Sequence, residues 1–192
     1  PVVDSAISHS PIALKRAGVM KYMDALELQR CLHGEIAEGQ RENTLVLVEH
    51  PSVYTAGKRT QDHERPHDGT PVIDVDRGGK ITWHGLGQIV GYSIVKLKSS
   101  TDVVGFVREL ETALIEICGE FGIKAERYCE RSGVWLRDAK GDRKIAAIGL
   151  RVAKGVTMHG FALNVNPDLS AYSKIIPCGI ADAKVTSLSA EL

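Results

Sequence analysis

Two stretches of the chain repeat apolar residues at the spacing of one helix face. The first predicts a helix over residues 19–36, and its apolar positions are Val19, Tyr22, Met23, Leu26 and Ile36. The second is the stronger signal, with an apolar stripe over 103–121. It follows Asp102, a residue type that caps helix starts, and precedes Gly122, a typical helix end. We therefore expect two long amphipathic helices.

Short runs rich in β-branched residues predict strands around these helices. They cover residues 44–49, 53–56, 72–75, 89–95, 134–136, 144–152 and 156–165. The polar residues 58–71 form a loop long enough to suspect a function, and 137–143 predict a hairpin. Helices and strands do not alternate regularly, which favours an α/β or α+β fold with a mixed sheet over a doubly wound nucleotide fold. No repeat or low-complexity linker is visible, so we expect a single domain over 1–192.

Charge and composition limit the classes of function that this protein can have. The chain contains 24 Lys plus Arg and 24 Asp plus Glu, so its formal net charge is zero, and an electrostatic nucleic-acid binder is not expected. No run approaches the roughly 18 apolar residues of a membrane helix. The four cysteines are widely spaced, which is typical of the reducing cytoplasm. The start at Pro1 and the end at Leu192 suggest trimmed termini.

Familiar ligand motifs are absent or broken. There is no Walker phosphate loop, and Gly85 and Gly87 fail the dinucleotide fingerprint because its third glycine is missing. His63 and His67 have the i, i+4 spacing of metal ligands, but Pro66 between them opposes a helix. We expect a solvated loop there and no metal.

The segment RGGKITWHGLGQ (77–88) combines glycines with polar and basic side chains. Glycines let a backbone pass close to a ligand, and Arg77, Lys80 and His84 could orient a polar group. From the residues alone, a tight structural hairpin and a binding loop are equally good interpretations.

Cys178 and Lys144 are the candidates for nucleophilic chemistry. Pro177 before Cys178 and Gly179 after it suggest a fixed turn that presents the thiol. Cys118 instead falls on the apolar helix stripe, where packing is expected. A reactive thiol needs a nearby cation, and Lys144 begins the apolar run KIAAIG. Such a lysine either reaches back to the surface or is desolvated and shuttles protons.

Five segments carry a family resemblance. They are LVEHPSVYTAGKRT (47–60), RGGKITWHGLGQIVGY (77–92), KIAAIGLRV (144–152), HGFALNVN (159–166) and PCGIADAKVTSL (177–188). Together they resemble the octanoyltransferases of lipoate biosynthesis, the lipoate-protein ligase B family. The likeness runs in order over most of residues 20–190, and it departs from the family at Leu86 and Ser93, where prolines are usual.

The resemblance implies a fold like the catalytic domains of biotin and lipoate protein ligases, a mixed β-sheet flanked by helices. It implies an acyltransferase that moves an octanoyl group from acyl carrier protein, through a thioester on Cys178, to a lysine of a lipoyl domain. Lys144 would lower the pKa of the thiol and act as general acid and base. No cofactor and no metal are implied, since the thioester arrives activated.

The same match assigns the residues of the acyl and pantetheine-thioester site. They are Arg77, Gly78, Gly79, Lys80, Ile81, Thr82, Trp83, His84, Ala147, Ile148, Gly149, Gly160, Phe161 and Ala162, with His50 and His159 as further site candidates. The implied acceptors are lipoyl domains of 2-oxoacid dehydrogenase complexes and the glycine-cleavage carrier protein. We expect a cytoplasmic monomer with no nucleic-acid or membrane partner. An acidic carrier protein would dock on a local basic patch, for which the candidates are Lys58, Arg59, Arg77 and Lys80.

Two alternatives remain open from the sequence. An ATP-dependent lipoyl or octanoyl ligase on the same fold would need ATP and would tolerate Cys178→Ser. A non-catalytic module that binds acyl groups or lipoyl domains would bind without turnover.

Overall fold

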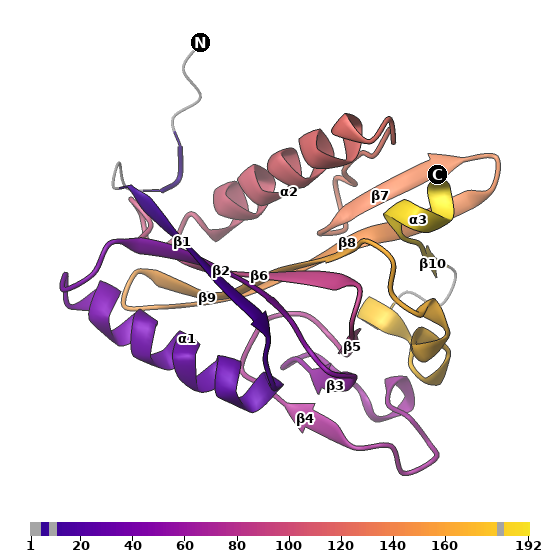
Figure 1. Ribbon diagram of the computed structural model, residues 1–192, viewed down its shortest axis with the longest axis horizontal. Helices are drawn as coiled ribbons and strands as arrows, with labels where there is room; N and C mark the ends of the chain where they lie inside the picture. Colours follow the sequence, from indigo (N-terminus) through magenta and orange to yellow (C-terminus); the bar gives the residue numbers. More distant parts are fainter. Residues whose placement is uncertain (1–4, 8–10, 180–182) are drawn as a thin grey trace.

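A mixed seven-stranded sheet crosses the protein, and a long helix covers each of its faces (Figure 1). This computed structural model describes residues 5–7, 11–179 and 183–192, apart from the side chain of Cys178. The strands follow the order β1 (Ile12–Val19), β2 (Asn43–Glu49), β6 (Gln88–Ile94), β9 (Val156–Asn164), β8 (Gly141–Ala153) and β10 (Lys184–Val185), and β7 (Val134–Asp138) also pairs with β8. The strands β1 and β10 run parallel to their neighbours, whereas the other pairs in this sheet are antiparallel.

A second, smaller sheet lies at one end of the large one, at the lower right of Figure 1. Its strands follow the order β4 (Val72–Asp74), β3 (Val53–Ala56) and β5 (Thr82–His84). Three single-turn or two-turn 3₁₀ helices belong to this region: η1 (Asp62–Glu64), η2 (Leu169–Lys174) and η3 (Pro177–Gly179). Both η2 and η3 contact β5, so the C-terminal part of the chain returns to the small sheet.

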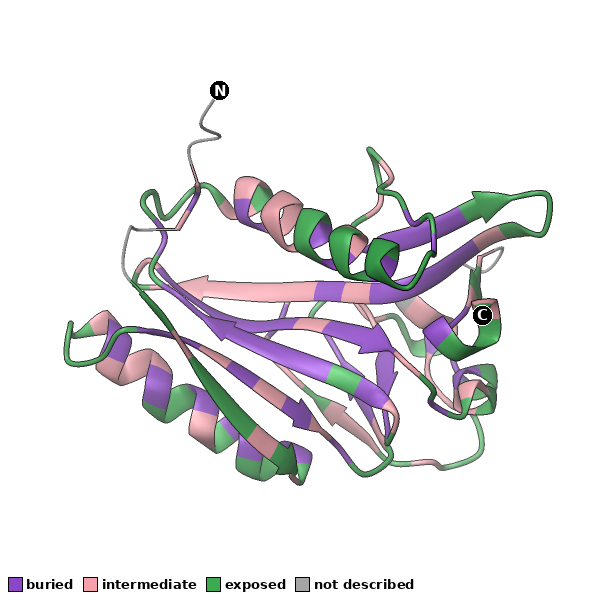
Figure 2. Ribbon diagram, turned by 45° about the horizontal axis from the view of Figure 1, so that its top comes forward, coloured by how far each residue is buried: buried purple, intermediate pink, exposed green. Residues whose placement is uncertain are grey.

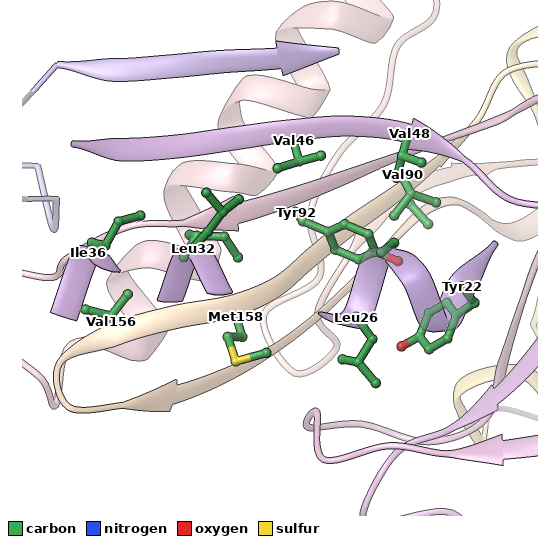
Figure 3. Packing of buried hydrophobic residues seen from close by; sticks show 13 residues of the cluster. Tyr22, Leu26, Leu32, Ile36, Val46, Val48, Val90, Tyr92, Val156 and Met158 are labelled. Carbon is green, nitrogen blue, oxygen red and sulfur yellow. The ribbon is translucent and has the colours of Figure 1, made fainter. Parts of the chain in front are cut away.

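The helix α1 (Tyr22–Ala37) packs its apolar side on β6, β9 and β2. Figure 3 shows Leu26, Leu32 and Ile36 on this helix facing residues such as Val90 and Met158 on the strands. Each fully buried side chain of this kind contributes about 1.5–3 kcal/mol relative to an exposed one. The helix is therefore held mainly by its contact with the sheet.

The helix α2 (Val103–Glu120) covers the opposite face. Its start is capped by the side chain of Asp102, which accepts the N–H of Gly105 at 3.0 Å, a contact worth about 1 kcal/mol. Just after its end, Gly122 has a left-handed φ of +78°. Leu114 and Cys118 pack against β7 and β8, and a short helix, α3 (Leu188–Glu191), ends the chain beside them.

The structure confirms the predicted α/β (α+β) class with a mixed sheet, and both helices. The first helix begins at Tyr22 rather than at Val19, because Val19 ends β1, a strand that the sequence does not predict. Most of β1 is exposed at the edge of the sheet (Figure 2), so it lacks the apolar pattern of a buried strand. The short strand β5 inside the glycine-rich segment is also absent from the sequence prediction.

Candidate active site

A cavity of about 270 Å³ lies between the α1 side of the large sheet and the segment 77–84, which ends with β5. Its floor consists of small residues on adjacent strands: Ala147 and Gly149 of β8 pair with Ala162 and Gly160 of β9. A Cβ on Gly160 would lie 2.0 Å from a backbone oxygen of β6, so only glycine fits there. These small residues leave space that a ligand can fill.

An irregularity in β8 turns Lys144 toward this cavity. Lys144 pairs with Trp135 of β7, but the preceding Val134 pairs with Ala146. Ile145 is therefore an extra residue opposite β7, and a bulge of this kind changes which side chains face each side of a strand. Ile145 and Ala146 both join the core under α2, whereas Lys144 lines the cavity with the small residues of the floor.

The surroundings of Lys144 orient its amine. Lys144 is 8% exposed, and its Nζ lies 4.9 Å from the ring centroid of Trp135. Gly133 leaves room beside it, because a Cβ there would lie 2.8 Å from Cε of Lys144. The backbone oxygen of Lys144 accepts the N–H of Thr186 at 2.9 Å. Segments on both sides of β8 thus hold this lysine.

The turn that carries Cys178 lies next to Lys144. The side chain of Cys178 is outside the described residues, but the backbone of η3 is placed. Pro177 in this turn lines a second, small cavity together with Lys144. The turn also meets Lys80, since a Cβ on Gly179 would lie 2.5 Å from Nζ of Lys80. Two lysine side chains therefore lie near the turn.

Lys80 is held by an ion pair with Glu64 of η1. The Glu64 side chain is only 1% exposed, and it also accepts the N–H of Gln61 at 2.9 Å. Burial alone would raise the pKa of Glu64, but the hydrogen bonds from Lys80 and Gln61 keep it below its usual value. The backbone oxygen of Glu64 accepts the N–H of Ile176 at 3.2 Å, which ties η1 to the segment before η3.

Arg77 shapes the glycine-rich segment. Its guanidinium donates to the backbone oxygens of Thr55 at 2.8 Å, Gly78 at 3.0 Å and Lys80 at 2.8 Å. The N–H of Gly78 donates to the backbone oxygen of Leu150 at 2.8 Å. The segment is therefore both a tight structural turn between β3 and β8 and a wall of the cavity.

His84 lines the cavity as a neutral ring. Its Nδ1 lies 2.7 Å from Oε1 of Gln88, and Nε2 of Gln88 donates to Oδ1 of Asn164 at 2.9 Å and to the hydroxyl of Tyr172 at 3.0 Å. A carboxamide oxygen only accepts hydrogen bonds, so Nδ1 of His84 carries the proton. Burial lowers the pKa of His84 to about 3, which leaves Nε2 as an acceptor.

His50 lies behind the cavity wall and does not line it. Its Nδ1 is 2.7 Å from the backbone oxygen of Met20, and its Nε2 is 2.7 Å from the hydroxyl of Tyr92, a lining residue. Nδ1 therefore donates, and Nε2 accepts the Tyr92 proton. Burial lowers the pKa of His50 and raises that of Tyr92, so both groups stay uncharged.

His159 lines the cavity far from Lys144. It pairs with Leu150, six positions after Lys144 on β8, which is roughly 17–20 Å along a strand. Nε2 of His159 lies 2.9 Å from Oδ1 of Asp76, and Arg151 also pairs with Asp76 at 2.8 Å. Burial lowers the pKa of His159. Its distance prevents a direct proton exchange with Lys144.

Most residues expected at the site line the cavity. They are Arg77, Gly79, Lys80, Thr82, His84, Lys144, Ala147, Ile148, Gly149, His159, Gly160, Phe161 and Ala162. Ile81 and Trp83 do not, because side chains alternate along β5. Thr82 and His84 take the cavity side, and the two apolar residues join the core of the small sheet. Gly78 is turned against β8 instead.

The sequence misses part of the lining. The missed residues are Tyr22, Val90, Tyr92, Glu130, Arg131 and Ser132, and Arg59 lines the cavity besides its expected place in a docking patch. The apolar and aromatic ones continue core patterns and give no sign of a cavity. The polar run 130–132, directly before Gly133, is the signal that could have been followed. Burial raises the pKa of Tyr22 to about 12, so it stays a neutral phenol.

The histidine pair of the 58–71 loop lies apart from this cavity. His63 and His67 are both exposed. Across the described ranges, no group of three or more His, Cys, Asp or Glu side chains gathers as a metal site requires.

The sequence places this fold and cavity in a known class of catalytic domain, that of the lipoyl protein ligases. The family described as the lipoyl protein ligase A/B catalytic domain matches residues 21–192. An octanoyltransferase of Salinispora tropica is 58% identical over 183 residues, which are 94% of this chain and 86% of that protein. An octanoyltransferase of Leifsonia xyli is 61% identical over 173 residues, 89% of this chain and 77% of that protein. The chain therefore belongs to the octanoyltransferase family, as the motifs predict, and it is an enzyme of octanoyl transfer.

Solved structures confirm the predicted lipoate-ligase fold. LipL1 of P. falciparum, solved in complex with lipoate, has a TM-score of 0.69 at 16% identity over 93% of this chain and 56% of that one. A bipartite lipoate protein ligase of Thermoplasma acidophilum has a TM-score of 0.65 at 17% identity over 87% of this chain and 66% of that one. The chain thus spans less than two thirds of either structure, and the likeness concerns the fold alone. No helix in the described part of the chain is long and apolar enough to cross a membrane.

Proposed function

We propose that this octanoyltransferase works by two acyl transfers at the Lys144 end of the cavity, with Cys178 as nucleophile and Lys144 as the shared acid and base. The donor is octanoyl-acyl carrier protein, and the acceptor is a lysine of a lipoyl domain. The observation that carries the proposal is that Lys144 lines the same small cavity as Pro177, the residue directly before Cys178 in the η3 turn. Neutral His84 and distant His159 are poorer bases for this step.

In the first transfer, Lys144 takes the proton of Cys178, and the thiolate attacks the carbonyl carbon of the carrier thioester. A C–S bond to Cys178 forms and the C–S bond to pantetheine breaks. Lys144 then returns the proton to the leaving pantetheine thiolate. A free thiol has a pKa near 8.5, so only a few per cent is ionised at about pH 7. Lysine side chains near the turn favour the thiolate.

In the second transfer, the amine of the acceptor lysine attacks the thioester on Cys178. The amide bond forms, the C–S bond breaks, the proton of the amine passes to Lys144, and Cys178 leaves as a thiolate. Deprotonating a lysine with a pKa near 10.4 at neutral pH costs about 4.6 kcal/mol. This step is therefore the larger hurdle, and it needs a base beside the thioester.

The cavity floor offers the octanoyl chain an apolar surface. Ala147, Gly149, Gly160 and Ala162 run away from Lys144 along β8 and β9. Each methylene removed from water contributes about 0.8 kcal/mol. A chain lying along this floor keeps its thioester at the Lys144 end.

The rim of the cavity supports docking of an acidic donor protein. Of the expected basic patch, Arg77 and Lys80 make internal contacts. Arg59 is exposed on the rim, and Arg131 lies half-buried on another segment of the lining. These two arginines are the groups that we propose to meet the carrier protein.

Intact mass after incubation with octanoyl-acyl carrier protein, with and without ATP, tests the proposal. We expect one octanoyl mass without ATP, removed by hydroxylamine and absent from Cys178→Ala. Cys129→Ala, which removes an exposed cysteine of the described chain, is the matched control and should label normally. Label that survives in Cys178→Ala, maps to Cys118, or requires ATP would overturn the assignment. Adding a lipoyl domain should then move the label to one of its lysines.

A further inference from the structure

We infer that Trp135 is a positioning residue for Lys144, and that its indole face stabilises the ammonium form that Lys144 takes in each acyl transfer. This inference rests on the proposed role of Lys144. Nζ of Lys144 lies 4.9 Å from the ring centroid of Trp135. A cation within about 6 Å of a tryptophan ring is attracted to the negative face of the ring, most strongly when it is desolvated. Lys144 is 8% exposed and Trp135 only 1%, so the desolvated case applies.

The ring is fixed from several sides. Trp135 exchanges two backbone hydrogen bonds with Glu126, each 2.8 Å long. Its ring meets that of Tyr128 edge-on, with centroids 5.3 Å apart and planes at 85°. On the strand, the bulge at Ile145 places Lys144 directly opposite Trp135. The aromatic face is therefore preorganised and does not have to move toward the lysine.

Other charged groups make this support necessary. Besides Lys144, the described lining of the cavity holds one carboxylate, that of Glu130, against four cationic side chains: Arg59, Arg77, Lys80 and Arg131. Neutral His84 lines the same cavity and adds no charge. Arg143, the residue before Lys144, is already paired with Asp138 and Glu191, and the η3 turn carries Cys178. Arg131 also approaches the Trp135 ring, at 5.9 Å. A proton taken up by Lys144 therefore adds positive charge to a cationic site, and the ring face offsets part of that cost.

Fluorinated tryptophans test the inference, because fluorine weakens the negative face of the ring with little change of shape. Mono-, di- and trifluorinated tryptophan are placed at position 135, and single-turnover acyl transfer to a lipoyl domain is measured against pH. A less stable ammonium releases its proton at lower pH. The acid limb of the profile should therefore move to lower pH with each fluorine, by about half to one pH unit in total.

Trp83 is the matched control, because it is the other tryptophan of the chain. Its Nε1 donates to Ser52 at 2.9 Å and its ring meets Tyr172, so the same analogues at 83 should leave the acid limb in place. An acid limb that stays fixed across the series at 135, or that moves equally for the series at 83, would overturn the inference. Transfer that persists in Lys144→Ala would instead overturn the proposed function, so the two failures are distinguishable.

Discussion

Replacing His84 by asparagine should flatten the acid side of the stability curve. Burial lowers the pKa of His84 to about 3 in the folded protein, whereas an unfolded histidine titrates near 6.5. Between these values the unfolded chain binds one more proton, so the free energy of unfolding falls as the pH is lowered, by about 1.4 kcal/mol per pH unit. From about pH 6.5 to 5 the loss due to His84 is about 2 kcal/mol.

Urea unfolding across this pH range measures the effect. Asparagine keeps an N–H donor for Gln88 but cannot titrate, so the slope of the variant should be smaller by about 1.4 kcal/mol per pH unit. The remaining slope includes His50 and His159, whose pKa values burial also lowers. Equal slopes for wild type and His84→Asn would refute the reasoning.

Three further predictions concern the lysines and the cavity floor. Lys144→Arg should acylate measurably but fail to transfer to a lipoyl domain, because a guanidinium keeps its charge and cannot accept a proton at neutral pH; single-turnover rates of each half-reaction check this, and efficient transfer would contradict it. Lys80→Met leaves the buried carboxylate of Glu64 without its ion pair and should lower the free energy of unfolding by about 3 kcal/mol. This is the low end for a buried pair, because the Lys80 side chain is 27% exposed. Urea unfolding should show that adding Glu64→Gln restores most of the loss. Gly160→Ala brings a Cβ within 2.0 Å of a backbone oxygen and should lower the free energy of unfolding by about 1–3 kcal/mol. Gly34→Ala, which has open space around it on α1, should raise the free energy of unfolding by about 0.5–1 kcal/mol. Thermal unfolding of the two variants checks both values.

The elements that were predicted are those whose signals are local. The helix α2 carries its own cap at Asp102 and its own stop at Gly122, and its apolar stripe has a helical period. The strands β2, β6 and β9 are largely buried and apolar, and β8 contains the apolar run 145–150, so their composition alone identifies them. The edge strand β1 is defined by its pairing with β2 and not by its own pattern, which is why sequence analysis misses it.

The residues of the candidate site likewise include some that a local sequence signal reveals and others that only the tertiary structure reveals. Cys178 and the 77–88 segment stand out because Pro and Gly neighbours are visible in one stretch of sequence. Tyr22 and Arg131 join the cavity only through the tertiary packing of α1 and of the 130–132 segment. The exclusion of His50 from the lining depends on the direction of its ring toward Tyr92, which no local pattern encodes.

Two departures from regular strand geometry produce the site on an otherwise regular sheet. If β8 alternated regularly through Ile145, Lys144 would face the same side as Ala146, toward the core under α2, and an ammonium buried among apolar groups is strongly disfavoured. At the other end of the cavity, Gly160 permits a close approach of β9 to β6 that any side chain would block. The position of Lys144 is therefore determined by the bulge of β8 opposite β7, and the cavity floor by the close packing of β9 on β6.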